Sequence, residues 1–301
     1  MPWSTLSHAK FGYNPAMTRV SRRRFLKTAL ALGVSSVGAT VYGWAGAHSF
    51  QVNRHRVTLE RLKSPLRLVQ LSDLHFGPWH GEDAVRSWVT AALEQKPDLI
   101  VITGDIVNSA CSLEREAKLV LELSRLKAPL GVYAVLGNHD YFHRNGTREE
   151  GIGHLVTALG DVGIRYLTNA GVQIRPDLHL AGVDDLWMGV VDLGKALERA
   201  PAEGATVLLS HNPDLLPDVP GNVGLTLSGH THGGQIRAPF GVGLHSISRF
   251  GERFQMGLVS SDPRADGSVA RGFVSRGLGT TGPPLRTFCP AEVVVLELEP
   301  A

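Results

Sequence analysis

Five segments of this chain each run from an apolar stretch straight into polar residues, and this pattern constrains the fold most. The polar residues are His, Asp or Asn, often beside Gly. The segments are Leu71-Ser72-Asp73-Leu74-His75, Ile102-Thr103-Gly104-Asp105, Leu136-Gly137-Asn138-His139-Asp140, Leu209-Ser210-His211 and Leu227-Ser228-Gly229-His230-Thr231-His232. Ligands of α/β proteins collect beyond the carboxyl ends of the strands, so we expect these side chains to form one site there.

The spacing of apolar residues predicts strands that alternate with helices in the first half of the body. Strands are expected at 66–71, 98–102 and 131–136, and helices at 82–94, 113–126 and 149–159. Such alternation predicts parallel strands with right-handed crossovers. Short strands then recur at 164–167, 172–174, 178–182, 207–210, 225–228, 272–275 and 293–298, with one helix at 193–199. We therefore expect an α/β fold with α+β character, in which a second sheet packs on the first within one domain.

The polar segments hold the ligand types of a divalent metal site. Asp73 and His75 lie two residues apart and can reach one ion from one loop, and His230 and His232 repeat this arrangement. Carboxylate oxygen and imidazole nitrogen suit hard or borderline divalent metals, and one bridging carboxylate would let the set serve two ions. Five further histidines lack this context and are predicted to lie at the surface or to be hydrogen bonded internally: His80, His143, His154, His179 and His245.

Together the five segments resemble the complete signature, in order, of the calcineurin-like metallophosphoesterases. The resemblance runs from about Leu66 to His232 and implies a four-layer sandwich, with two mixed β-sheets flanked by helices. Three further features narrow the resemblance to one branch of this family. They are the N-terminal leader, the Gly-His-Thr-His-Gly-Gly-Gln run from Gly229 and the segment 275–280. They resemble the bacterial exported branch that includes the YkuE- and YaeI-type phosphodiesterases.

The resemblance implies a role for each residue of the motifs. One metal would be held by Asp73, His75 and His232, the other by Asn138, His211 and His230, and Asp105 would bridge both. His139 would face the phosphate and the leaving oxygen without binding metal, and Asp140 is expected to orient His139 through a hydrogen bond. The family points to Mn for the two ions, although the ligand set also admits Fe, Zn, Co or Ni.

The expected reaction is hydrolysis of a phosphoester by a hydroxide that bridges the two ions. A phosphodiester of the cell envelope, linked to a lipid or a nucleotide, is the expected substrate. Alternatives are a pyrophosphatase of the UDP-lipid type, a monoesterase, and a non-catalytic metal-binding envelope protein. His139 speaks against the last, because a binding-only site has no need of it. The pocket could be shaped by Asn108, 185–188 and 279–286, and Arg276 and Arg286 could pair with a second phosphate or be ordinary surface residues.

Residues 1–47 have the layout of a secretory signal. The basic run Ser21–Lys27 precedes an uncharged stretch from Thr28 to Val52, and Ala45-Gly46-Ala47 has the small residues of a cleavage site. The pair Arg22-Arg23 resembles a twin-arginine signal, which implies the twin-arginine export machinery as a partner. The protein is then expected in the periplasm or on the outer face of the cytoplasmic membrane of a bacterium. Either the leader is cut, leaving 48–301 as the domain, or residues 28–52 associate with the membrane.

Charge argues against nucleic acid as a partner. Six of the 30 Lys and Arg lie within residues 1–47, which leaves 24 against 28 Asp and Glu, a net charge of −4 for the remainder. The basic character thus belongs to the leader, and the body has no electrostatic footprint for nucleic acid. The cysteines, Cys111 and Cys289, show no metal-binding spacing and are expected to be buried or free thiols, with a disulfide as the alternative after export.

Overall fold

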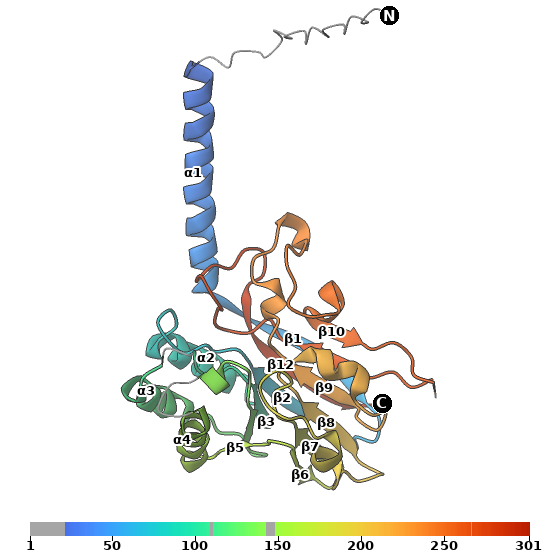
Figure 1. Cartoon of the computed structure of the whole chain (residues 1–301). Coiled ribbons are helices and arrows are strands. Elements are labelled where there is room, and N and C mark those ends of the chain that lie inside the picture. The colour runs from blue at the N-terminus through green and yellow to red at the C-terminus, as the bar shows by residue number, and fades with distance from the viewer. Residues whose placement is uncertain (1–21, 109–110, 143–147, 266) are drawn as a thin grey trace, which may run out of the picture. The chain divides into compact units, whose positions relative to one another are not determined.

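The computed structural model describes residues 22–108, 111–142, 148–265 and 267–301 and divides the chain into two compact units (Figure 1). The first unit is Met1–Val41 and the second is Tyr42–Ala301. Helix α1 (Arg22–Ala47) crosses this boundary, so its C-terminal residues belong to the second unit. Within the described residues, no helix has both the length and the apolar character needed to span a membrane. His143 lies outside the described residues.

The second unit holds all the other elements. Its helices are α2 (Glu82–Glu94), α3 (Leu113–Leu123), α4 (Arg148–Asp161) and α5 (Leu193–Leu197). Its strands are β1 (Phe50–Leu59), β2 (Leu66–Leu71), β3 (Leu99–Thr103), β4 (Val132–Val135), β5 (Ile164–Tyr166), β6 (Ala170–Arg175), β7 (Leu178–Gly182), β8 (Ala205–Leu209), β9 (Leu225–Ser228), β10 (Gly257–Ser260), β11 (Arg271–Val274) and β12 (Ala291–Pro300). Short 3₁₀ turns are η1 (Asp140–Phe142), η2 (Pro213–Asp218), η3 (His232–Gly234), η4 (Pro239–Gly241) and η5 (Gly251–Phe254).

Both sheets are mixed, as expected. The first has the order β1-β12-β2-β3-β4-β5, and the second has the order β10-β11-β9-β8-β7-β6. The predicted parallel run is present from β2 to β5, while β12 is antiparallel to β2 and parallel to β1. In the second sheet β7, β8, β9 and β11 are parallel, and the outer strands β6 and β10 are antiparallel to their neighbours.

Apolar side chains divide the second unit into four layers. One buried cluster joins the first sheet to α2, α3 and α4, and includes Trp88 of α2 and Leu119 of α3. A second cluster lies between the sheets, where Leu68 of β2 and Leu227 of β9 are both fully buried. A third cluster covers the other face of the second sheet with residues of α5, η2 and η5. The predicted four-layer sandwich of two sheets flanked by helical elements is therefore confirmed (Figure 1).

Local sequence explains where the helices begin. Helix α2 has acidic residues in its first turn, which favour the positive end of the helix dipole, and it has the predicted bounds. Helix α3 begins after Ser112, whose hydroxyl accepts a hydrogen bond from the backbone N–H of Arg115. The helix ends at Leu123, three residues before the predicted end, and residues 124–126 form a turn.

Two sheet assignments and two strands differ from the sequence analysis. Segments 164–167 and 293–298 were expected in the second sheet, but β5 and β12 belong to the first. Order along the chain favoured the second sheet for both segments, whereas β12 returns to pair between β1 and β2. Strands β1 and β10 were not predicted. The outer strand β1 begins inside the uncharged leader stretch, and β10 is a short edge strand in which half-buried and exposed residues alternate.

Candidate metal centre

The loops after five strands meet at the carboxyl edges of the two sheets. Asp73 follows β2, Asp105 follows β3, and Asn138 and His139 follow β4, while His211 follows β8 and His230 follows β9. Backbone hydrogen bonds continue from the ladders into the loops, from the N–H of Asp73 to Gly104 and from that of Gly229 to His211. The predicted convergence of these side chains is therefore found.

Possible ligand atoms form three groups, and within each group all the atoms lie within 4.8 Å of one another. The groups share members. The groups are Asp73, His75 and His232; His75, Asp105 and His139; and Asp105, His211 and His230. The first and third correspond to the two predicted metal sets, with Asp105 in the second set. The shared members make one continuous cluster, which can hold two ions side by side.

Asp105 occupies the position expected of a bridging carboxylate. Its Oδ2 lies 3.6 Å from Nε2 of His75, in the first set, and 3.3 Å from Nε2 of His211, in the second. Its Oδ1 accepts a hydrogen bond from the backbone N–H of His139 at 2.8 Å, which fixes the orientation of the carboxylate. One oxygen of Asp105 is thus presented to both sets.

The first set is closely spaced. His75 and His232 bring their Nε2 atoms to 3.0 Å, and Nε2 of His232 lies 3.4 Å from Oδ1 of Asp73. Two neutral imidazole lone pairs and a carboxylate oxygen facing one point form an arrangement that a shared cation satisfies. The residues present therefore fit a divalent ion.

The second set contains buried polar atoms without protein partners. Oδ1 of Asn138 and Nε2 of His230 are buried, and among the described residues neither has a hydrogen-bond partner. The other ring nitrogen of His230, Nδ1, lies 3.2 Å from Nε2 of His211. Buried polar atoms normally find partners, so these two atoms are well suited to ligate a second ion.

The electrostatics of the cluster keep most of the ligand histidines neutral. Burial lowers the pKa of His75 and of His230 to about 3 and takes the pKa of His232 well below its ordinary value. Burial also raises the pKa of Asp73 to about 6. Neutral imidazole is the form that binds metal.

The pKa of His211 is raised and that of Asp105 is lowered, the reverse of the shifts at the other ligand histidines and at Asp73. Burial acts to lower the pKa of His211, but the charge and hydrogen bond of Asp105 outweigh it and raise the pKa well above its ordinary value. Burial acts to raise the pKa of Asp105, yet His211 and the neighbouring histidines hold it below its usual range. Nδ1–H of His211 donates to the carbonyl oxygen of Thr103 at 2.7 Å, which leaves Nε2 facing Asp105. A metal at Nε2 would displace a proton from that nitrogen.

Strained backbone marks the ligand positions. Left-handed φ angles occur at five of them: Asp73 (51°), His75 (43°), Asp105 (51°), His230 (69°) and His232 (52°). Non-glycine residues rarely adopt this region, and such strain clusters at functional sites. A Cβ on Gly137 would lie 2.3 Å from Oδ1 of Asp105, so glycine is required where this loop approaches.

His139 is placed differently from the other histidines. Its ring lies edge-on to that of His75, with centroids 4.7 Å apart. Its Nδ1 is buried without a hydrogen-bond partner in the described part of the chain. Distance alone groups His139 with His75 and Asp105 as a possible ligand, so the geometry allows a ligand role beside the predicted catalytic one.

The structure corrects the predicted contact of Asp140. Its Oδ1 accepts hydrogen bonds from the backbone N–H groups of Ile106 (2.8 Å) and Val107 (3.1 Å), and its Oδ2 accepts one from Gly137 (2.9 Å). Asp140 therefore holds two loop backbones together and makes no hydrogen bond to the ring of His139. Burial raises its pKa to about 7.

A buried hydroxyl network behind Asp73 was missed from the sequence. Ser72 donates to Oδ2 of Asp73 at 2.6 Å, Thr103 donates to Ser72 at 2.7 Å, and Gln70 donates to Thr103 at 2.9 Å. This chain of bonds fixes the rotamer of Asp73. Polar residues at buried positions of β2 and β3 were the signal that could have revealed it.

The residues proposed to shape the substrate pocket differ in what they contact. The exposed ring of Trp187 lies edge-on to His230, with centroids 4.3 Å apart, so it borders the cluster. Arg286 is fully buried and donates to the carbonyl oxygens of Gly279 and Arg276. Arg276 pairs with Glu292 at 2.6 Å. Both arginines are thus engaged within the protein.

The remaining histidines and the cysteines behave largely as expected. His245 is exposed, His154 contacts Glu116 at 2.5 Å, and His80 is buried with Nε2 3.0 Å from the hydroxyl of Thr280. His179 differs from this expectation, because it is fully buried and neither ring nitrogen has a hydrogen-bond partner in the described residues. Both cysteines are buried and free.

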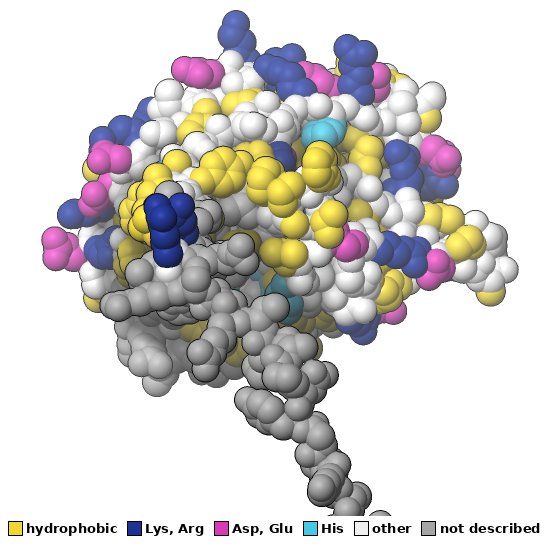
Figure 2. All heavy atoms as spheres, turned by 90° about the horizontal axis from the view of Figure 1, so that it is seen from above, with side chains coloured by type: hydrophobic (Ala, Val, Ile, Leu, Met, Phe, Trp, Pro, Cys, Tyr) yellow, Lys and Arg dark blue, Asp and Glu magenta, His cyan; other side chains and the backbone are white. Residues whose placement is uncertain are grey.

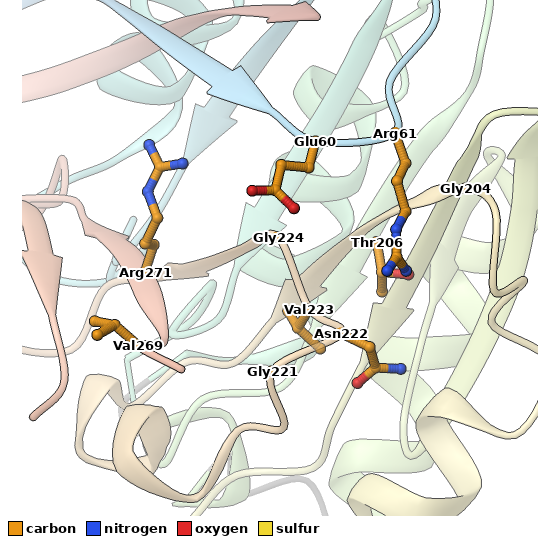
Figure 3. Close-up of a pocket in the computed structure, with 10 residues that line it drawn as sticks. All are labelled: Glu60, Arg61, Gly204, Thr206, Gly221, Asn222, Val223, Gly224, Val269 and Arg271. Carbon is orange, nitrogen blue, oxygen red and sulfur yellow. The ribbon is translucent and has the colours of Figure 1, made fainter. Parts of the chain in front are cut away.

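A separate pocket of about 140 Å³ lies at the opposite ends of the strands (Figure 3). Gly204 and Gly224 in its lining immediately precede β8 and β9, whereas the metal motifs follow those strands. Its lining contains the single carboxylate Glu60, drawn between Arg61 and Arg271 in Figure 3, and no histidine. It is therefore distinct from the metal centre.

Comparison with known proteins places the chain in a family. The model of the calcineurin-like phosphoesterases matches residues 66–234. The metallophosphoesterase YkuE of Bacillus subtilis is 32% identical over 297 residues, which cover 94% of this chain and 99% of YkuE. A transmembrane protein with a metallophosphoesterase domain from Bos taurus is 32% identical over 93% of this chain and 64% of its own length. A dimetal phosphatase from Danio rerio has a similar structure, with a TM-score of 0.45, 13% identity and coverage of 74% and 90%.

The site defines the class, a metal-dependent phosphoesterase, and the chain belongs to the calcineurin-like phosphoesterase family. The resemblance found from the five motifs, including that to YkuE, is confirmed. The protein is accordingly a metal-dependent phosphoric ester hydrolase with a site suited to two metal ions.

Proposed function

We propose that the protein hydrolyses a phosphodiester at a binuclear centre. Asp73, His75 and His232 would hold one ion, Asn138, His211 and His230 the other, and Asp105 would bridge them. The observation that carries this assignment is the position of Asp105 Oδ2, within 3.6 Å of a histidine from each set. Two ions held in this way supply a nucleophilic water at neutral pH and neutralise charge on the phosphate.

The protein's own groups then orient the reaction. The bond from the backbone of His139 to Asp105 holds the histidine beside the first set. A protonated His139 would face the leaving oxygen and give it a proton, which as general acid catalysis is typically worth ~10²–10⁴ in rate. Trp187 beside His230 would contact the part of the substrate nearest the second set.

As the substrate, we favour a phosphodiester with one phosphate over a nucleotide–lipid diphosphate. A diphosphate would benefit from a free arginine near the cluster. The two arginines considered for that role, Arg276 and Arg286, are engaged by Glu292 and by backbone carbonyl groups. This observation supports phosphodiesterase over pyrophosphatase activity.

The leader supports a location outside the cytoplasm. Arg22 and Arg23 precede a long uncharged segment, the layout of a twin-arginine signal. Its machinery would carry the folded protein to the periplasm or to the outer face of the cytoplasmic membrane. The name of the bovine relative describes a transmembrane protein, which agrees with a membrane-associated role. Mn, loaded before export, is the proposed metal, and the proposed substrate is an envelope phosphodiester.

Metal loading and turnover test this function together. The full chain is loaded in turn with Mn, Fe, Zn, Co and Ni, and the bound metal is counted before bis-p-nitrophenyl phosphate and p-nitrophenyl phosphate are offered. We expect two ions per chain, the highest turnover with Mn, and preference for the diester. Full loading without turnover of either compound would instead indicate a metal-binding protein, and preference for the monoester would indicate a monoesterase.

A further inference from the structure

Large apolar side chains gather at the exposed surface on one side of the second unit. Figure 2, seen from above, shows hydrophobic side chains in a band across that side. We call this surface the apolar face and define it by Tyr42, Trp44, Trp79, Phe240, Val242, Leu244, Ile247 and Phe288, all of which are exposed. Exposed apolar surface of this kind marks an interaction site in soluble proteins.

Contacts among four segments join these residues into one surface. The rings of Tyr42 and Phe288 lie 5.5 Å apart, and those of Trp44 and Trp79 lie 6.2 Å apart. The backbone N–H of Arg237 donates to Thr287, which links the segment of Phe288 to the segment that follows Gln235. The end of α1 and the segments 236–247 and 281–288 are thus neighbours.

A pocket connects the apolar face with the metal centre. It measures about 250 Å³, and its apolar wall is made by Ile236, Leu244, Ile247 and Pro283. The lining also includes His232, which belongs to the first metal set. A hydrocarbon chain in this pocket would therefore contact a residue of the metal centre.

The segments around the apolar face carry few acidic side chains. Residues 42–50, 78–81, 235–251 and 279–291 contain no Asp or Glu. The exposed Glu252 lies against Gly243 and pairs with Arg237, which compensates its charge, so acidic lipid head groups would meet little repulsion here. Trp and Tyr, of which this face exposes three, are the side chains enriched where protein meets the membrane interface.

The last residues of α1 belong to this face. Ala47 and Gly43 are buried in the second unit, and a Cβ on Gly46 would lie 2.3 Å from the carbonyl oxygen of Arg286. The end of α1 is thus built into the second unit, and in the sequence it directly follows the uncharged residues 28–41.

We propose that the apolar face lies on a lipid surface and that the 250 Å³ pocket receives a hydrocarbon chain of an amphiphilic phosphodiester. This inference rests on the proposed phosphodiesterase function and names the class of its substrate. The phosphate of such a molecule reaches the metal centre while its chain lies between Leu244 and Ile247. The membrane both concentrates the substrate and positions the centre above its head groups.

Two synthetic diesters that differ only in chain length test the pocket. The full chain, loaded with Mn, is given methyl p-nitrophenyl phosphate or dodecyl p-nitrophenyl phosphate with vesicles of phosphatidylcholine and phosphatidylglycerol. We expect kcat/KM to be at least about tenfold higher for the dodecyl ester, because burial of each methylene is favourable. Leu244→Ser should lower the ratio of kcat/KM for the dodecyl ester to kcat/KM for the methyl ester by about tenfold.

The matched control is Leu121→Ser, which changes a leucine of similar exposure on α3, away from this face, and should leave the ratio unchanged. Turnover of neither ester would refute the phosphodiesterase function itself. Equal turnover of both esters, or a ratio unaffected by Leu244→Ser, would overturn the lipid inference and leave the function intact. A dimer in solution that Leu244→Ser dissociates would assign the face to a second copy of the chain instead.

Discussion

The carboxylate of Asp140 accepts a hydrogen bond from the backbone N–H of Gly137 at 2.9 Å, so the residue after His139 holds the turn that presents both Asn138 and His139. Its other oxygen binds two amides of the loop after Asp105. Asp140 thus fixes two metal-bearing loops relative to each other, without touching the site.

We expect Asp140→Asn to weaken metal binding as well as stability. An amide presents an N–H₂ group where one oxygen now accepts, so at least one buried N–H loses its partner, at a cost of about 1–3 kcal/mol. Loss of such a supporting contact typically lowers metal affinity about 10–100-fold. Metal titration and thermal unfolding of the metal-free protein measure the two effects. An unchanged affinity would show that the loops hold their positions without Asp140.

His139→Ala should separate catalysis from metal binding. The variant loses the group proposed to protonate the leaving oxygen, so turnover should fall by ~10²–10⁴ while two ions remain bound. Metal content and kcat on bis-p-nitrophenyl phosphate are measured on the same sample. His154→Gln, which changes a histidine paired with Glu116 outside the cluster, is the control. Loss of one ion in His139→Ala would instead make His139 a ligand, as its distances permit.

Gly46→Ala should destabilise the second unit. The added methyl would meet the carbonyl oxygen of Arg286 at 2.3 Å, and overpacking of this kind costs about 1–3 kcal/mol. Gly38→Ala is a matched control in the same helix, because its Cβ would have no atom within 4 Å. Differential scanning calorimetry should show a lower Tm for Gly46→Ala alone. Equal Tm values would mean that the end of α1 is not held against Arg286 in solution.

Glu122 should stabilise the protein only above mildly acidic pH. It is buried between α2 and α3 and accepts hydrogen bonds from Arg86 and Arg125. Burial acts to raise its pKa, but these bonds outweigh it and hold the pKa below the ordinary 4.5. A lowered folded pKa gives stability that is complete above 4.5 and is lost as the pH falls through the folded value.

Glu122→Gln should therefore lower the free energy of unfolding by about 1 kcal/mol at pH 7, since both arginines are largely exposed and screened. The difference from the unmodified protein should narrow below pH 4.5, where the unfolded chain already binds the proton. Urea titrations at both pH values measure it. Asp83→Asn removes the fully exposed partner of Arg86 and should change little at either pH. A difference independent of pH would exclude this carboxylate as its source.

The sequence predicted the metal-bearing half of the fold well because its information is local. Apolar strands run directly into ligand motifs, so β2, β3, β4, β8 and β9 and the loops after them could be placed from spacing alone. The side chains of Asp73 and Asp105 meet because β2 and β3 are parallel neighbours that end at the same edge.

What could not be predicted depends on pairing between distant segments. Nothing near 291–300 in the chain indicates that β12 enters the first sheet between β1 and β2. The role of Asp140 was missed for a similar reason, since its partners Ile106 and Val107 lie more than 30 residues away. The packing of Tyr42, Gly43 and Gly46 on the body likewise depends on residues 285–288, which are remote in sequence.

The position of β12 has a consequence for the order of assembly. Strand β1 pairs with β12 alone, and β2 lacks its second neighbour until β12 arrives. Strand β12 thus closes the first sheet, and until it pairs, β2 exposes an open edge to other chains. Completion of this sheet therefore waits for pairing between segments far apart in the chain, which is slow because the long loop between them must close first.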